Sequence, residues 1–131
     1  METFELEIVT PNGVIFNGQA QETTLPGSEG EFGVLPQHVS LVTPLTAGVI
    51  DFIKEDGNKE SIVINWGYVN VAVNRVCVLV QGAVALKGSD ESEVAKALSE
   101  AKELIKGASD NNVADGIVLS KIEEAAKTVI G

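Results

Sequence analysis

The chain has 131 residues, of which 44% are hydrophobic and only 5% aromatic, and its formal net charge is −10. This length suits one compact domain, or a small domain with an appendage, and the acidic balance with nine scattered basic residues argues against a nucleic-acid surface. The single cysteine excludes an internal disulfide, and no apolar run reaches the roughly 18–20 residues that span a bilayer. We therefore expect an intracellular protein, without a signal peptide, that reaches a membrane only through a partner.

The first 85 residues have the pattern of many short strands separated by turns. Phe4, Leu6 and Ile8 alternate with glutamates, which predicts a strand with one buried face. An Asn-Gly turn at 12–13 leads into a short return strand that closes at Asn17-Gly18. Five more strands are expected, over the ranges Gln19–Leu25, Ala47–Lys54, Ile62–Trp66, Tyr68–Val73 and Val76–Val80, with Gly67 as a bulge or bend. This spacing is typical of a β-sandwich or barrel.

The stretch Leu25–Leu45 is rich in turn-forming residues. It contains three glycines, three prolines, two carboxylates (Glu29 and Glu31) and the only histidine, His38. Glycine permits positive φ and proline fixes φ, so turns shape this backbone more than any long regular element does. We expect a rigid loop with short strands that presents Glu29 and Glu31 at its tip.

The last expected hairpin of this region is apolar on both faces. Val76, Val78 and Val80 share one face, while Cys77 and Leu79 share the other. A sandwich layer needs only one apolar face, so the second must be covered by something else. In this setting Cys77 is expected to be a buried, small apolar side chain.

From residue 86 onward the pattern is helical. Asp90 to Gly107 shows an apolar stripe at helical spacing, with Asp90 as N-cap and Gly107 at the end. A second helix is expected over 113–129, with Ile122 on its apolar face. The sequence therefore predicts a β-sandwich over 1–85 followed by an α-helical hairpin, an antiparallel helix-turn-helix, over 86–131.

The residue pattern contains no recognisable catalytic or metal-binding constellation. The glycines at 27, 30 and 33 are spaced GxxGxxG, which is not a dinucleotide motif. Glu29 and Glu31 have no nucleophile or electrophile nearby, and His38 has no second ligand at metal-binding spacing. Solvated loop charges and a structural or interface histidine are the favoured interpretations, so we expect no catalytic residue, metal or cofactor.

A long ordered set of residues resembles the bacterial-type epsilon subunit of rotary ATP synthases, which is called delta in mitochondria. The resemblance is strong over residues 4–81 and extends more weakly through the helical segment. Trp66 departs from the pattern, because a glycine is usual there. The matching positions between Ile8 and Val49 are Thr10-Pro11, Gly13, Phe16, Gly18, Pro26-Gly27, Gly30-Glu31, Gly33-Val34-Leu35-Pro36, His38, Leu41, Thr43 and Gly48.

The resemblance implies a non-catalytic subunit of the central rotor, on the cytoplasmic face of the bacterial inner membrane. The sandwich would join the gamma subunit to the membrane ring of c subunits, and the helices would reach the catalytic alpha/beta head. The loop facing the c ring would consist of Gly27, Ser28, Glu29, Gly30, Glu31 and His38. We expect gamma, or the protein's own helices, to cover Tyr68, Cys77 and Leu79.

In some members of this family the helical hairpin binds ATP through a motif that opens its first helix, and the hairpin restrains hydrolysis. Here Asp90 remains, but Glu93 replaces the arginine and Val94 the alanine. Losing the guanidinium and adding negative charge predict weak or absent ATP binding. The second helix is also poor in cations, which argues against strong inhibition.

Two other classes of function remain open at this point. One is a stand-alone β-sandwich that binds a small ligand through Trp66, Tyr68 and the loop, and it predicts a monomer with a concave aromatic site. The other is an enzyme using Glu29, Glu31 and His38, for which the sequence offers no activating geometry.

Overall fold

The computed structural model describes residues 2–37, 39–86, 91–106 and 122. His38 and most of the expected second helix therefore lie outside the described residues. The described elements are β1 (Phe4–Thr10), β2 (Gly13–Gly27), β3 (Gly30–Val34), β4 (Leu41–Leu45), β5 (Gly48–Lys54), β6 (Lys59–Ile64), β7 (Gly67–Ala72), β8 (Arg75–Val80), β9 (Ala83–Ala85) and α1 (Glu91–Lys106).

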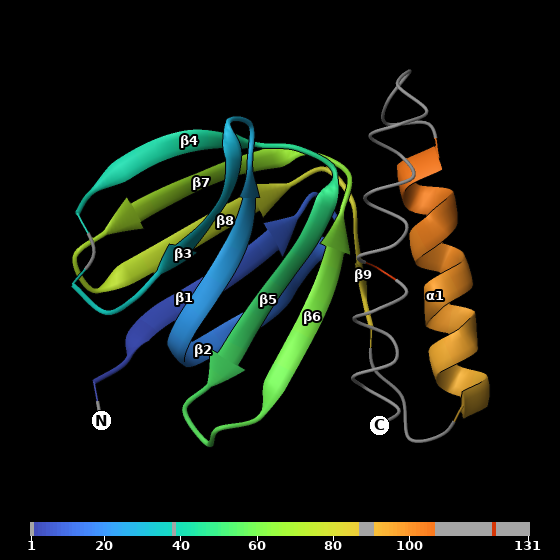
Figure 1. The fold of residues 1–131 in the computed structure, drawn as a ribbon, viewed down its shortest axis with the longest axis horizontal. Helices are drawn as coiled ribbons and strands as arrows, with labels where there is room; N and C mark the ends of the chain where they lie inside the picture. Colours follow the sequence, from blue (N-terminus) through green and yellow to red (C-terminus); the bar gives the residue numbers. More distant parts are fainter. Residues whose placement is uncertain (1, 38, 87–90, 107–121, 123–131) are drawn as a thin grey trace.

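The strands form one continuous sheet that folds into two layers (Figure 1). One layer contains β4, β7, β8 and β1, where β8 runs parallel to β1 and the other pairings are antiparallel. The other layer contains β3, β5, β6 and β9. The long strand β2 belongs to both, because Gly13–Ala20 pairs with β1 and the following residues pair with β5 and β3.

The core lies between the two layers and is built from the alternate residues of each strand. The buried faces of β1 and β8 contribute Leu6, Ile8 and Val78, and β5 contributes Phe52 from the opposite side. Phe16 packs on Phe52 with ring centroids 4.6 Å apart. Aliphatic side chains supply most of this core, as the low aromatic content predicts.

A second, smaller apolar cluster lies on the outer side of the β5–β6–β9 layer. Val49 of β5 and Val63 of β6 are buried there against Ala101 and Ile105 of α1. Figure 1 shows α1 on the β9 side of the sandwich. Ile122 is fully buried in the same cluster. The helical stripe expected from the sequence is thus confirmed for α1, and a β-sandwich followed by a helix is observed.

Three local expectations were wrong, for reasons of packing. The predicted strand break at Asn17-Gly18 does not occur, since β2 runs through it. Gly18 leaves room for the Phe16 ring, whose Cζ would lie 3.1 Å from a Cβ at this position. Gly67 is not a bend but the first residue of β7, where a Cβ would collide with the carbonyl oxygen of Leu79. Cys77 is half-buried rather than buried.

Candidate partner-binding surfaces

The expected loop tip is a tight turn between β2 and β3. Gly27 pairs with Gly30 across the hairpin, and Ser28 and Glu29 form the turn. Gly30 has a φ of 128°, a conformation that side-chain-bearing residues rarely adopt. The Ser28 N–H donates to the carbonyl of Pro44 at 3.1 Å, which ties the turn to β4. The tip is therefore held in place by β2, β3 and β4.

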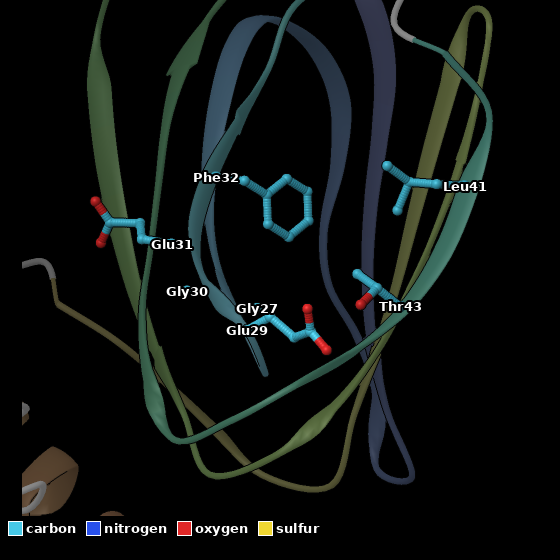
Figure 2. A pocket seen from close by; sticks show the side chains of 7 residues that line it. All are labelled: Gly27, Glu29, Gly30, Glu31, Phe32, Leu41 and Thr43. Atoms are coloured by element: carbon cyan, nitrogen blue, oxygen red, sulfur yellow. The ribbon is translucent and has the colours of Figure 1, made fainter.

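A cavity of about 320 Å³ opens beside this turn (Figure 2). Phe32 of β3 and Leu41 of β4 project into it from opposite sides, and Glu29 extends toward Thr43. Glu31 also lines the rim, and both glutamates are exposed. Gly27, Ser28, Glu29, Gly30 and Glu31 thus form the end of the β2–β3 hairpin. The cavity has an apolar floor, formed by Phe32 and Leu41, and an acidic rim, formed by Glu29 and Glu31.

The outer face of the β4–β7–β8–β1 layer carries a row of apolar side chains. Pro44 pairs with Tyr68, Tyr68 with Leu79, and Leu79 with Val9, so these four residues lie side by side across four strands. Trp66 lies next to the row, just before β7. Tyr68 and Leu79 are 52% and 53% exposed, and Trp66 is 50% exposed. We call Val9, Pro44, Trp66, Tyr68 and Leu79 the apolar strip.

The strip is hollowed at its end near Trp66. A shallow cavity of about 340 Å³ lies between the end of β1 and the β7–β8 pair. Trp66, Tyr68 and Leu79 line it together with Val9, Thr10, Pro11, Val80 and Gln81. α1 packs on the β6–β9 side instead, so within the described residues Tyr68 and Leu79 remain exposed to a partner.

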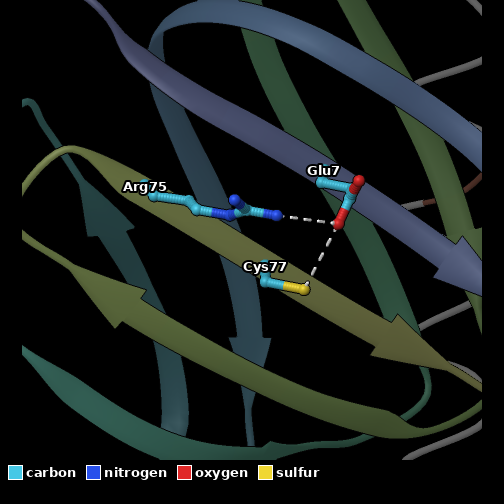
Figure 3. Close-up of polar contacts among 3 residues, drawn as sticks. All are labelled: Glu7, Arg75 and Cys77. Atoms are coloured by element: carbon cyan, nitrogen blue, oxygen red, sulfur yellow. Dashed lines mark hydrogen bonds and ion pairs between the residues drawn. The ribbon is translucent and has the colours of Figure 1, made fainter.

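A polar row adjoins the strip on the same face (Figure 3). Cys77 pairs with Glu7 of β1 and with Asn70 of β7. The Cys77 thiol donates to Glu7 Oε1 at 3.7 Å, and Arg75 Nη2 donates to the same oxygen at 3.3 Å. Partial burial, and then the negative charge of Glu7, raise the pKa of Cys77 above its ordinary value of 9.0. The thiol is therefore a neutral donor at physiological pH, not a thiolate nucleophile.

The described residues contain no group of three His, Cys, Asp or Glu side chains that could hold a metal ion. In the segment that was compared with the family's ATP motif, Val94 is buried and Glu93 is exposed, whereas Asp90 lies outside the described residues. No helix in this part of the chain is long and apolar enough to cross a bilayer. The two surfaces above are therefore the best candidates for function.

The sequence pointed to Tyr68 and Leu79 of the strip and to Cys77 beside it, but not to Val9 and Pro44. Val9 and Pro44 belong to strands distant in sequence, and only the observed pairing places them beside Tyr68 and Leu79. The alternation of β1 did carry a signal, because Val9 is an apolar residue in a position that faces outward with Glu5 and Glu7. Trp66 was named as a binding residue only for the ligand-binding alternative, and it is half exposed.

The described part of the chain is thus a β-sandwich with a helix packed on the outer side of one layer. The sequence model described as "ATP synthase, Delta/Epsilon chain, beta-sandwich domain" matches residues 3–86. The chain is 57% identical over 130 residues to the ATP synthase epsilon chain of Sulfurimonas denitrificans, covering 99% of this chain and 100% of the relative. The epsilon chain of Wolinella succinogenes is 52% identical, with 97% of each chain covered.

Solved structures agree with these relatives. A chain in a cryo-EM structure of the Euglena gracilis mitochondrial ATP synthase has a TM-score of 0.63 and 28% identity, covering 96% of this chain and 80% of that one. A chain from the central stalk and c ring of the Tetrahymena thermophila enzyme has a TM-score of 0.58; at 10% identity it shows the fold alone.

The chain therefore belongs to the ATP synthase delta/epsilon chain family. It is a non-catalytic rotor subunit, and as such it is part of a membrane-associated complex. This membership does not favour a stand-alone ligand-binding module.

Proposed function

We propose that the chain joins a gamma-type subunit to the c ring through two separate surfaces, the apolar strip and the acidic tip. Rotation driven by ion flow then passes through the sandwich to the catalytic head. The observation that carries this proposal is the apolar strip, aligned across four strands and left exposed by α1.

The apolar strip suits the gamma subunit. Contiguous exposed apolar side chains mark protein interfaces, and tryptophan and tyrosine are enriched among residues that dominate binding energy. The strip offers both, with Leu79 paired to Tyr68 and a cavity of about 340 Å³ to receive a partner side chain. Cys77 and the Glu7–Arg75 pair border it, so polar groups rim an apolar centre.

The acidic tip suits the polar loops of the c ring. Glu29 and Glu31 are exposed on a turn that β2, β3 and β4 hold in place, and His38 belongs to the same proposed surface by resemblance. Charges at an exposed rim set orientation and association rate more than raw affinity. The tip would thus fix the register of the subunit on the ring, on the cytoplasmic face of the bacterial inner membrane.

The helical part is proposed as a second unit over 86–131, forming an antiparallel helix hairpin beside a sandwich over 1–85. The apolar cluster of α1 supports this, because Ile122 of the expected second helix is buried in it. The hairpin would contact the alpha/beta head when the complex is assembled.

Substituting one residue of the strip tests the assignment to gamma. Leu79→Asp places a charge at the centre of the strip and should abolish co-purification with gamma. The matched control is Ala72→Asp, which places the same charge on the same outer face, beside Arg75 and outside the strip. If Leu79→Asp retains gamma as well as Ala72→Asp does, the strip is not the gamma surface.

The altered motif at Glu93 and Val94 leads us to propose that the hairpin binds ATP weakly or not at all. Isothermal calorimetry of the full chain should show no binding in the millimolar range, and binding at that affinity or tighter contradicts the proposal.

We also propose that the helices inhibit ATP hydrolysis only weakly. This is tested by deleting residues 89–131 and assaying ATP hydrolysis by the complex. A many-fold rise would show that the helices inhibit despite their acidic balance.

A further inference from the structure

The chain crosses between the two sandwich layers twice at one corner. Ile64 pairs with Ala83 in one layer, and Gly67 pairs with Val80 in the other. Between these pairs, the Asn65 N–H donates to the Gly82 carbonyl at 3.3 Å, and the Gln81 N–H donates to the Trp66 carbonyl at 3.0 Å. The two crossing segments are therefore bonded to each other throughout the corner.

The Asn65 side chain fastens both segments at once. Its Oδ1 accepts the Gly82 N–H at 2.9 Å and the Trp66 N–H at 2.8 Å. One carboxamide oxygen thus fixes the backbone that carries Trp66, at the hollowed end of the apolar strip, and the backbone that leads into β9.

α1 packs on the other side of this same corner. A Cβ built on Gly82 would lie 2.7 Å from Leu104 Cδ1 and 3.2 Å from Asn65 Nδ2. A side chain on Gly82 would therefore require Leu104 of the helix to shift, because Leu104 and Asn65 of the corner lie against this position. A continuous line of contacts runs from Leu104 through Gly82 and Asn65 to Trp66.

We infer that Asn65 is a positioning residue that couples the seating of α1 to the placement of Trp66 in the apolar strip. A helix seated on Gly82 holds the Asn65 carboxamide in place, and the carboxamide holds the Trp66 backbone. Coupling of this kind is reciprocal, so whatever binds the strip also favours the seated helix. Only the identity of the strip's partner rests on the proposed function; the coupling is a property of the free chain.

Amide hydrogen exchange on the full chain without partners tests the coupling. Leu104→Ala removes the contact on Gly82 and should accelerate exchange of the Trp66 amide by about tenfold, within the range for residues that share contacts. The Glu55 amide, bonded to the Gln19 carbonyl at the opposite end of β6, is the internal control and should not change. Equal acceleration at Glu55 means global destabilisation and overturns the inference.

Variants of Asn65 show whether its oxygen carries the effect. In an Asn65→Ala background, Leu104→Ala should change Trp66 exchange by less than about twofold, the usual limit for independent sites. Asn65→Asp keeps the accepting oxygen and should restore the response to Leu104→Ala. A full tenfold response in the Asn65→Ala background overturns the inference. The co-purification of Leu79→Asp with gamma tests the proposed function separately.

Discussion

A single residue, Gly30, fixes the backbone shape of the tip. Its φ of 128° is costly for any residue with a Cβ, although open space surrounds the position. Gly33, three residues along the same strand, has no unusual φ and no atom closer than 4.0 Å to a built Cβ. The backbone conformation therefore favours glycine at position 30, whereas neither conformation nor packing requires a glycine at position 33.

We predict that Gly30→Ala destabilises the protein by about 1–3 kcal/mol, the cost of holding such a backbone conformation. Gly33→Ala should stay within about 0.5 kcal/mol of the parent. Urea unfolding followed by circular dichroism measures both. Equal stabilities for the two variants would show that the turn relaxes without strain.

The pKa of the Cys77 thiol depends on the charge of Glu7 beside it. Glu7→Gln removes the negative charge that helps to raise the pKa of Cys77, so the pH midpoint of its alkylation should fall toward 9.0. Glu5→Gln, two residues earlier on the same face, removes an equal charge that is not bonded to the thiol. The midpoint should stay in place for this control, and a shared shift would assign the effect to net charge alone.

The same pKa sets a limit on stability at high pH. Because folding raises the pKa of Cys77, the contribution of this thiol to stability is complete below its ordinary pKa of 9.0. It is lost as pH rises through the higher folded pKa. We therefore predict that Cys77→Ser loses less stability than the parent as pH rises from 8 through the pKa of the folded thiol, measured by urea unfolding. Parallel pH profiles would contradict this.

Helix α1 is an element whose stability comes from the cluster it shares with the sandwich. Ile105→Ala and Ile122→Ala each remove a fully or almost fully buried side chain, so each should cost about 2–5 kcal/mol in the free energy of unfolding. Glu103→Ala on the exposed side of α1 should change it by less than about 0.5 kcal/mol. A small effect of Ile122→Ala would mean that the second helix contributes little to the folded chain.

Elements whose apolar residues recur at a regular spacing were predictable from the sequence. The alternation of Phe4, Leu6 and Ile8 predicted β1, and the apolar stripe predicted α1 to within one residue of its end. The continuity of β2 was not predictable, since Asn17-Gly18 carries the signal of a turn and only the Phe16 ring explains the glycine. The two candidate surfaces also differ in how far the sequence could predict them. The tip is local in sequence and was predicted, whereas the strip depends on pairing between four strands.

The whole molecule presents two surfaces of different chemistry, which should respond differently to salt. Charged contacts at an exposed tip are screened when the Debye length falls to about 3 Å in 1 M salt. Burial of the apolar strip is not weakened by this screening. We predict that raising salt releases the chain from the c ring before it releases gamma, as measured by co-sedimentation. If gamma were released before the c ring, the tip would be the gamma surface and the strip would be the c-ring surface.

The most direct test of the two-surface account is proton-driven ATP synthesis by a reconstituted complex that carries Glu29→Ala, Glu31→Ala and Leu79→Asp together. With both surfaces altered, torque cannot pass between ring and shaft through this subunit, and the account predicts a many-fold loss of synthesis. The same complex carrying Ala72→Asp should match the parent. A synthesis rate equal to the parent's in the triple variant would contradict the account.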